Sequence, residues 1–250
     1  MPPRALRPVG IVLADKPAGP SSFALVAQLR QRTRARTGHA GTLDPFATGL
    51  LLLLSGGATR LAPCFVGLDK RYETDVDLTA TTTTGDPEGG VVARRSPPSR
   101  TEVEERLEGL RGEVELPIPA ASAVKIGGER AYRLARRGVE VDMPLRRSRV
   151  DALDVITYSE SDDGGVHAVR LDLRVSSGTY VRAIAQALGG HCRTLRRTEI
   201  GPFAVQEAND ERLLVPSEAL ARLPADALQR VPVAVRVGVV DLEREPTAAS

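Results

Sequence analysis

The sequence predicts an α+β fold, in which strands and helices mix without strict alternation. Residues 49–55 form an apolar run bounded by glycines, which is typical of a buried strand. Residues 71–79 alternate with a period of two, which indicates a strand with one buried face. Stretches with helical spacing and capping residues lie between such strands at uneven intervals. Together these observations predict a sheet flanked by helices.

The elements expected before residue 70 follow from apolar spacing and from capping residues. They are a buried strand at 11–14, a helix from Ser21 or Ser22 to about Arg32, a loop at 33–48, the strand at 49–55, and a helical stretch at 58–66 that Pro63 interrupts.

The elements expected after residue 70 rest on the same signals, with glycine and proline marking the breaks. They are the strand at 71–79, a largely loop segment at 80–100, a helix from the capping box Thr101-Glu102-Val103-Glu104 to about Leu110, a strand at 168–175, a helix at 179–188, a last helix capped by Ser217 that runs to about Ala221, and disordered residues at 243–250.

Composition places the chain among globular proteins that fold without disulfides. Its 250 residues can bury an ample core, and the two cysteines, Cys64 and Cys192, lack the spacing of a disulfide framework or a zinc site. The N-terminus lacks the apolar core of a signal peptide, and the longest apolar run, 50–54, is too short to span a bilayer. We therefore expect a cytoplasmic protein with no membrane partner.

One loop has the composition of a catalytic site. It reads Gly38-His39-Ala40-Gly41-Thr42-Leu43-Asp44-Pro45-Phe46-Ala47-Thr48-Gly49 and isolates one carboxylate, Asp44. Pro45 disfavours the helical region for Asp44 and holds its backbone extended, while the glycines let a ligand approach the main chain closely. An isolated Asp-Pro pair ordinarily starts a turn. The surrounding pattern favours an exposed catalytic acid.

This loop resembles the catalytic motif of the pseudouridine synthase B family, enzymes that isomerise a uridine in the T loop of tRNA. Further blocks resemble the family, in its order, over residues 10–203. They are Gly10-Ile11-Val12-Leu13-Ala14-Asp15-Lys16-Pro17-Ala18-Gly19-Pro20-Ser21-Ser22, Asp69-Lys70-Arg71-Tyr72, Ser122-Ala123-Val124-Lys125 with Gly128 and Tyr132, Ser177-Gly178-Thr179-Tyr180-Val181-Arg182, and Leu195-Arg196-Arg197.

The resemblance implies a pseudouridine synthase fold with a largely antiparallel central sheet flanked by helices. It places the catalytic domain at 1–215, an RNA-gripping insertion at about 120–149, and a short tail at 216–250. Most members continue into a PUA-type or substitute RNA-binding domain, for which we expect this tail to be too short. The implied activity is stand-alone, guide-independent conversion of uridine to pseudouridine at position 55 of tRNA, by base flipping.

The resemblance assigns the chemistry to three residues. Asp44 is the nucleophile or base and acts either at the ribose or at the uracil ring; the sequence leaves both routes open. Tyr72 can stack on uracil through its ring and move a proton through its hydroxyl. Arg182 is expected to pair with Asp44, and an arginine in a helix's first turn calls for a local carboxylate because it opposes the helix dipole. The isomerisation has no redox change, so we expect no cofactor and no metal.

The other substrate contacts follow from the same residue-by-residue match. Tyr180 and Leu195 are expected to form walls of the uracil pocket, and His39 is expected to hold the RNA after the target base leaves its stack. A loop histidine is more often simply solvated, but this one lies in the best-matched block. The match also places Lys70, Gly41 and Thr42 among the substrate contacts.

Arginines gather around this site although the formal net charge is only +2. One cluster lies within 30–36, a second within 130–149, and the third consists of Arg193, Arg196 and Arg197. Solvated helix faces also carry such clusters. Because the guanidinium fork binds phosphate oxygens in pairs, three clusters indicate the tRNA T stem-loop as partner. We expect a monomer with no protein partner, whose RNA-backbone contacts are Arg34, Arg36, Lys125, Arg133, Arg136 and Arg196.

Two features depart from the family, and two rival functions remain. Thr82-Thr83-Thr84 replaces the usual Thr-Asp-Thr and Thr79 replaces a glycine, which puts the order of the loop near the cleft in doubt. One rival is a non-catalytic RNA-binding or RNA-folding protein, against which the intact Asp44, Tyr72 and Arg182 argue. The other is the guide-RNA-dependent relative that modifies ribosomal RNA, which normally carries the extra RNA-binding domain.

Overall fold

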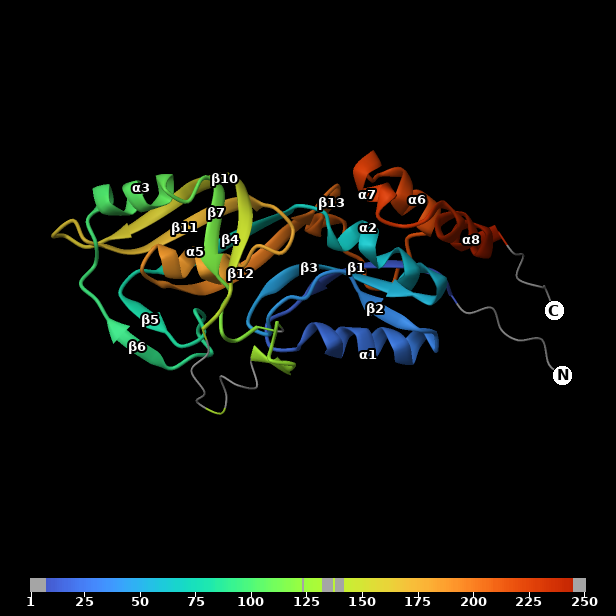
Figure 1. The fold of residues 1–250 in the computed structure, drawn as a ribbon, viewed down its shortest axis with the longest axis horizontal. Helices are drawn as coiled ribbons and strands as arrows, with labels where there is room; N and C mark the ends of the chain where they lie inside the picture. The colour runs from blue at the N-terminus through green and yellow to red at the C-terminus, as the bar shows by residue number, and fades with distance from the viewer. Residues whose placement is uncertain (1–7, 123, 132–136, 138–141, 245–250) are drawn as a thin grey trace. The chain divides into compact units, whose positions relative to one another are not determined.

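The structure is a computed structural model that describes residues 8–122, 124–131, 137 and 142–244 (Figure 1). The chain divides into two compact units, the first made of residues 1–70 and 196–250 and the second of residues 71–195. Among the residues described, no helix is long and apolar enough to cross a membrane.

The first unit is built on a small, mostly antiparallel sheet. Strand β3 (Thr48–Ser55) pairs antiparallel with β1 (Gly10–Lys16) and with β2 (Thr37–His39). The last part of β12 (His191–Ile200) pairs with the start of β3 in parallel, and β13 (Phe203–Ala204) closes a hairpin with β12. The strands predicted at 11–14 and 49–55 are therefore confirmed.

Both faces of this sheet are covered, which explains why β3 is apolar throughout. Leu51 and Leu53 pack with Leu25 and Leu29 of helix α1 (Ser22–Thr33). The alternate residues of β3, among them Leu52, pack on the opposite face against the C-terminal helices. Figure 1 shows α1 and those helices on opposite sides of β1 and β3. A strand buried on both faces loses the alternation of a half-exposed strand.

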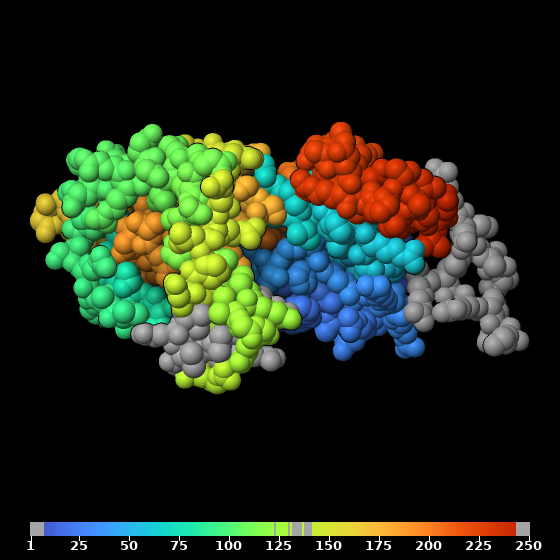
Figure 2. Space-filling model, in the orientation of Figure 1, coloured from blue at the N-terminus to red at the C-terminus, as the bar shows by residue number. Residues whose placement is uncertain are grey.

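The last part of the chain is more ordered than its sequence indicated. It forms α6 (Pro216–Ala221), α7 (Ala225–Gln229) and α8 (Val233–Arg244). Helix α8 lies against η1 (Gly56–Leu61), α7 lies against α2 (Ala62–Val66), and α6 lies against α8 and β1. Figure 2 shows these helices in red over the cyan segment. The prediction that Ser217 caps a helix was wrong. Pro216 takes the first turn instead, and the Ser217 amide and hydroxyl donate to the Glu243 carboxylate at 2.8 and 2.7 Å.

The second unit carries the longer strands. Its sheet has the order β12-β4-β11-β10-β7, where β4 is Lys70–Asp77, β11 is Val166–Val175, β10 is Leu145–Glu160 and β7 is Gly112–Pro117. The pairs β10–β11 and β10–β7 are antiparallel. The predicted strands at 71–79 and 168–175 are confirmed, whereas β7 and β10 were not predicted. The second unit also contains α3 (Arg100–Glu108), α5 (Val181–Ala187), and the short strands β8 (Lys125–Ile126) and β9 (Glu129–Arg130).

The segment 80–100 is largely loop, as expected, and contains the short hairpin β5 (Ala80–Thr82) and β6 (Val91–Arg94). One local expectation in the second unit was wrong. The capping box lies at Ser99 and Glu102, not at Thr101 and Glu104. The Glu102 carboxylate accepts from the Ser99 amide at 2.7 Å, and the Ser99 hydroxyl accepts from the Glu102 amide at 3.3 Å.

Gly49 is the point where three strands of the first unit come closest. It is paired with Lys16 of β1 and with Arg197 of β12, and its φ is 103°. A Cβ atom at this position would lie 2.2 Å from the Arg197 carbonyl oxygen. Any residue larger than glycine must therefore push β12 away from β3.

We predict that Gly49→Ala lowers the free energy of unfolding by at least about 2 kcal/mol, because it combines a backbone clash with a left-handed φ. Urea denaturation measures this loss. Gly38→Ala in neighbouring β2 is the matched control, since no described atom lies within 4 Å of its added Cβ. Equal unfolding midpoints for the two variants would contradict the assigned close approach.

Candidate active site

Asp44 lies half-buried in the loop between β2 and β3 of the first unit. Lys16, at the end of β1, holds the second half of this loop through its ammonium group. Its side chain is fully buried, and its ammonium donates to the carbonyls of Pro45 at 3.0 Å, Ala47 at 2.7 Å and Pro17 at 2.9 Å. The carbonyls of Pro45 and Ala47, which follow Asp44 in the loop, are therefore turned into the protein.

Arg197 fixes the two ends of the same loop. Its guanidinium is buried and donates to the carbonyls of Leu50 at 2.7 Å, Gly41 at 3.1 Å and Thr42 at 3.4 Å. No carboxylate of the described residues forms an ion pair with it. The sequence placed Arg197 in a cluster suited to phosphate, and its burial contradicts that expectation. Its acceptors are main-chain carbonyls, which leave no signature in side-chain identity.

The first turn of α1 is joined to the loop from the other side. Ser21 is the N-cap, and its hydroxyl accepts from the Ala24 amide at 3.2 Å. Ser22 is buried; its hydroxyl donates to the Leu43 carbonyl at 2.9 Å and accepts from the Leu43 amide at 2.8 Å. Of the two serines that could cap the helix, one caps it and the other holds the residue before Asp44.

His39 ends β2 beside this loop. Burial, and secondarily the positive charge of Arg197, lowers the pKa of its imidazole, so the ring is neutral at pH 7. Its Nδ1 is buried and has no hydrogen-bond partner within the described part of the chain. The ring packs edge-on against Phe23 of α1, with centroids 5.2 Å apart and planes at 81°. Phe23 was not singled out from the sequence.

Lys70, expected as a substrate contact, has a buried side chain. Its ammonium donates to the carbonyls of Val66 at 2.6 Å and of Leu68. Burial, together with the charges of Arg197 and Arg230, lowers the pKa of this amine to about 7, and Asp69 opposes the shift. These contacts hold the segment before β4, and a contact with substrate stays a prediction.

Arg182 lies in the first turn of α5 in the second unit, as predicted, and is buried. It forms an ion pair with Asp86 at 3.1 Å, in which the two side chains are only 3% and 4% exposed. It also donates to the carbonyls of Thr84 at 2.7 Å and Ala121 at 3.0 Å. The expected local carboxylate is therefore present, and it is Asp86, which sequence reasoning missed. Asp44 belongs to the first unit, and its pairing with Arg182 stays a prediction.

Asp86 also orders the loop that the sequence put in doubt. Its carboxylate accepts from the Glu88 amide at 3.0 Å and from the Thr84 hydroxyl, and its carbonyl accepts from the Thr82 hydroxyl at 2.8 Å. Thr82 and Thr84, in the triplet that replaces the usual Thr-Asp-Thr, thus both bind to Asp86. These contacts give order to the loop that the sequence left in doubt.

Three more predicted site residues belong to the second unit. Tyr72 lies near the start of β4, as expected, and is largely buried. Tyr180 is the N-cap residue of α5 and is half-buried, while Leu195 lies in β12 with its side chain buried. Tyr180 is two residues from Arg182, so the helix start holds both. Their roles in binding uracil stay predictions.

The residues predicted to contact the RNA backbone differ in their availability. Arg34 and Arg36 are exposed, and neither forms an ion pair with a carboxylate in the described ranges. Of the predicted substrate contacts in the Asp44 loop, Thr42 is exposed and Gly41 is half-buried. Arg196 forms a two-point ion pair with Asp15, at 3.0 and 2.7 Å. Lys125 is exposed on β8. Arg133 and Arg136 lie outside the described residues.

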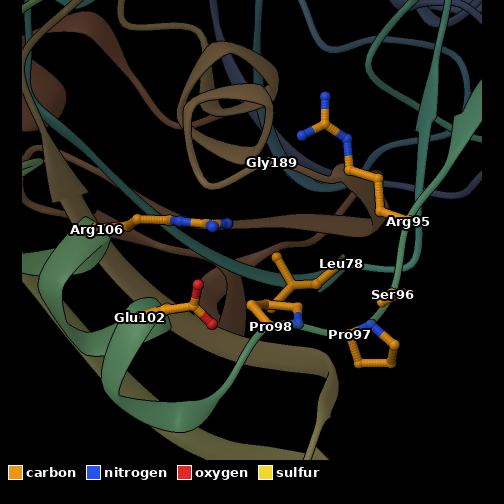
Figure 3. Close-up of a pocket in the computed structure, with 8 residues that line it drawn as sticks. All are labelled: Leu78, Arg95, Ser96, Pro97, Pro98, Glu102, Arg106 and Gly189. Atoms are coloured by element: carbon orange, nitrogen blue, oxygen red, sulfur yellow. The ribbon is translucent and has the colours of Figure 1, made fainter.

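The second unit also has a hollow of about 520 Å³ between α3, the segment 95–98 and the turn at Gly189 (Figure 3). Arg106 and Glu102 extend toward it from α3. Both already have partners, because Arg106 donates to the Leu188 carbonyl at 2.9 Å and Glu102 completes the capping box. None of the predicted site residues lines this hollow.

We predict that Asp86→Asn lowers the free energy of unfolding by about 3–5 kcal/mol, because the Arg182 guanidinium is left buried without its counter-charge. Guanidinium chloride denaturation measures the loss. The matched control is Glu73→Gln, which removes the exposed ion pair with Arg170 in the same unit and should cost no more than about 1 kcal/mol. A loss of less than 1 kcal/mol for Asp86→Asn would contradict the buried pair.

Comparison with known proteins identifies the family of this chain. The model of the TruB family pseudouridylate synthase (N terminal domain) matches residues 29–181, more than half of the chain. The tRNA pseudouridine synthase B of Mycobacterium sp. (strain KMS) is 41% identical over 224 residues, which cover 86% of this chain and 73% of the relative. The protein of the same name from Leifsonia xyli subsp. xyli is 40% identical over 225 residues, covering 84% and 73%.

Solved structures show the same fold. A chain of a Cbf5-Nop10-Gar1 complex superposes with a TM-score of 0.57 at 26% identity, covering 78% of this chain and 50% of that chain. A chain of an H/ACA RNP bound to a substrate RNA containing 2'-deoxyuridine superposes with a TM-score of 0.56 at 20% identity, covering 92% and 61%. This chain thus spans half to three fifths of the length of those two chains. It belongs to the TruB family of pseudouridylate synthases.

Proposed function

We propose that this chain converts uridine to pseudouridine at position 55, in the T loop of tRNA, as a stand-alone enzyme that needs no guide RNA. The observation that carries the proposal is the Asp44 loop. A family-matched carboxylate stands half-buried on a loop whose carbonyls are held by two buried cations, Lys16 and Arg197. The names of the relatives, tRNA pseudouridine synthase B, support tRNA as the substrate.

The reaction breaks the N1–C1′ bond of uridine, turns the uracil, and joins C5 to C1′. A proton leaves C5 and N1 gains one, so the product is an isomer of the substrate. Neither an oxidant nor an external energy source is required, and the proposal therefore includes no cofactor and no metal. The protein must supply a charged group, a site for proton movement, and a pocket that holds uracil while it turns.

Asp44 supplies the charged group in this proposal. Its carboxylate can attack the ribose carbon C1′ or the uracil ring, or it can act as a base, and each route needs it ionised. Tyr72 supplies a ring that can stack on uracil and a hydroxyl that can carry a proton. We assign Arg182 to orient the carboxylate of Asp44, and the Arg182–Asp86 pair gives that guanidinium a fixed position in the second unit.

The target uridine must leave the T loop to reach Asp44, at a cost of a few kcal/mol. Contacts to the RNA backbone supply that free energy, and they are electrostatic. Arg34 and Arg36 are suited to this because both are exposed and have no carboxylate partner among the described side chains. We infer a monomer that acts in the cytoplasm, where tRNA is modified.

Asp44→Asn should abolish turnover while leaving fold and RNA affinity nearly intact, because the amide keeps the shape of the carboxylate and loses its charge. The assay is tritium release from unmodified tRNA labelled at uracil C5, since only formation of the new carbon–carbon bond frees that hydrogen. Asp226→Asn, at an exposed side chain of helix α7, is the matched control and should release tritium at the parental rate.

Two results would contradict the proposal in different ways. Release by Asp44→Asn within tenfold of the parent would show that Asp44 is not the catalytic carboxylate. A parent protein that binds tRNA tightly but releases no tritium would show a binding or folding protein on the same fold.

A further inference from the structure

Phe23 is an exposed aromatic ring in a chain that has few aromatic residues. The sequence holds four phenylalanines, four tyrosines and no tryptophan. Phe65 and Phe203 are fully buried, as apolar rings ordinarily are, whereas Phe23 is 70% exposed. A single exposed apolar side chain is common on a protein surface, so the case for a ligand rests on where Phe23 lies.

The position of Phe23 is fixed from both sides. The residue before it, Ser22, is buried and makes two hydrogen bonds with Leu43, the residue next to Asp44. The ring itself rests edge-on against His39. Phe23 therefore projects beside the Asp44 loop from a held backbone, and helix α1, of which it is part, packs on the sheet through Leu25 and Leu29.

The chemistry of this spot matches a nucleobase. A phenyl ring has neither a charge nor a hydrogen-bonding group, so it cannot bind phosphate, but its face stacks on any base. The His39 ring beside it is neutral and half-buried, which leaves Phe23 as the more open aromatic surface. Arg34 and Arg36, which are exposed just before the start of β2, supply positive charge for the phosphates of the bound RNA strand.

We propose that Phe23 binds the RNA substrate directly, by stacking on an unpaired base that lies outside the uracil pocket. The inference rests on the proposed function, because it takes RNA as the ligand. The base is one that remains in the loop when the target uridine is flipped out. Phe23 adds a stacking surface beside His39, the residue expected to hold the RNA after the target base leaves its stack.

The first test is the affinity of the full chain for an unmodified T-arm hairpin across a salt series. Phe23→Ala and Phe23→Leu should weaken binding by about 5- to 100-fold, because one base loses its stacking partner, whereas Phe23→Tyr should stay within threefold. The slope of log K against log salt should not change, since the ring neutralises no phosphate. Arg36→Ala, by contrast, should reduce that slope.

The second test uses the absence of tryptophan from the chain. Phe23→Trp introduces a single fluorophore, whose emission should be quenched when the hairpin binds because the indole stacks on a base. Val233→Trp is the matched control: Val233 is 63% exposed on α8, which packs on the opposite face of the sheet from α1, and its emission should not change.

Four results would overturn the inference. The first is an unchanged RNA affinity of Phe23→Ala, and the second is equal quenching in both tryptophan variants. The third is that Phe23→Ala has no effect on RNA affinity when His39 is already alanine. The fourth is that sedimentation shows a dimer of the parent that Phe23→Ala lacks, while the RNA affinity is unchanged. The third would show that Phe23 only supports His39, and the fourth that the ring binds a second copy of the chain.

Failure of this inference is distinguishable from failure of the proposed function. If the parent protein binds the hairpin and releases C5 tritium, and Phe23→Ala binds the hairpin with the same affinity as the parent, only the stacking role is wrong. If the parent neither binds the hairpin nor releases tritium, both the function and the inference are wrong.

Discussion

Two buried cations that bind carbonyl groups determine the shape of the candidate active site. Lys16 and Arg197 approach the Asp44 loop from β1 and β12, the strands on either side of β3, and between them they bind the carbonyls of residues 41, 42, 45, 47 and 50. A buried carbonyl without a donor costs free energy, and a buried cation without an acceptor costs more. The loop and the cations therefore stabilise one conformation together. Gly49 makes this possible, because only glycine lets β12 carry Arg197 so close to β3.

The two units hold their key arginines in different ways, and the difference affects the electrostatic field. Arg182 is neutralised by Asp86 inside the second unit. Arg197 is bound by carbonyl dipoles, which satisfy its hydrogen bonds without cancelling its charge. Burial is the larger cause of the lowered pKa of both His39 and Lys70, and the charge of Arg197 lowers each further. Burial and this charge together favour the neutral imidazole of His39, and the positive potential beside the loop favours an approaching RNA backbone.

Much of the fold could be predicted from the sequence because side-chain patterns report burial. The apolar run at 49–55, the alternation at 71–79 and the serines before α1 each correspond to an observed element. The residues that were missed act through the main chain or over long distances in sequence. Arg197 binds carbonyls, Asp86 pairs with an arginine 96 positions away, and Ser217 binds Glu243 near the end of α8. No local pattern contains such pairings, and only the folded backbone brings them together.

The most direct test of this account is the single-turnover rate of C5-tritium release by Arg197→Lys at saturating tRNA. Lysine keeps the positive charge but is a compact donor that cannot reach Gly41, Thr42 and Leu50 together. A displacement of the loop by about 1 Å is enough to slow a reaction by about 10²-fold. The account predicts a rate lowered by about that factor, with an RNA dissociation constant within threefold of the parent. A rate within threefold of the parent, in a variant that remains folded, would contradict the claim that Arg197 positions the Asp44 loop.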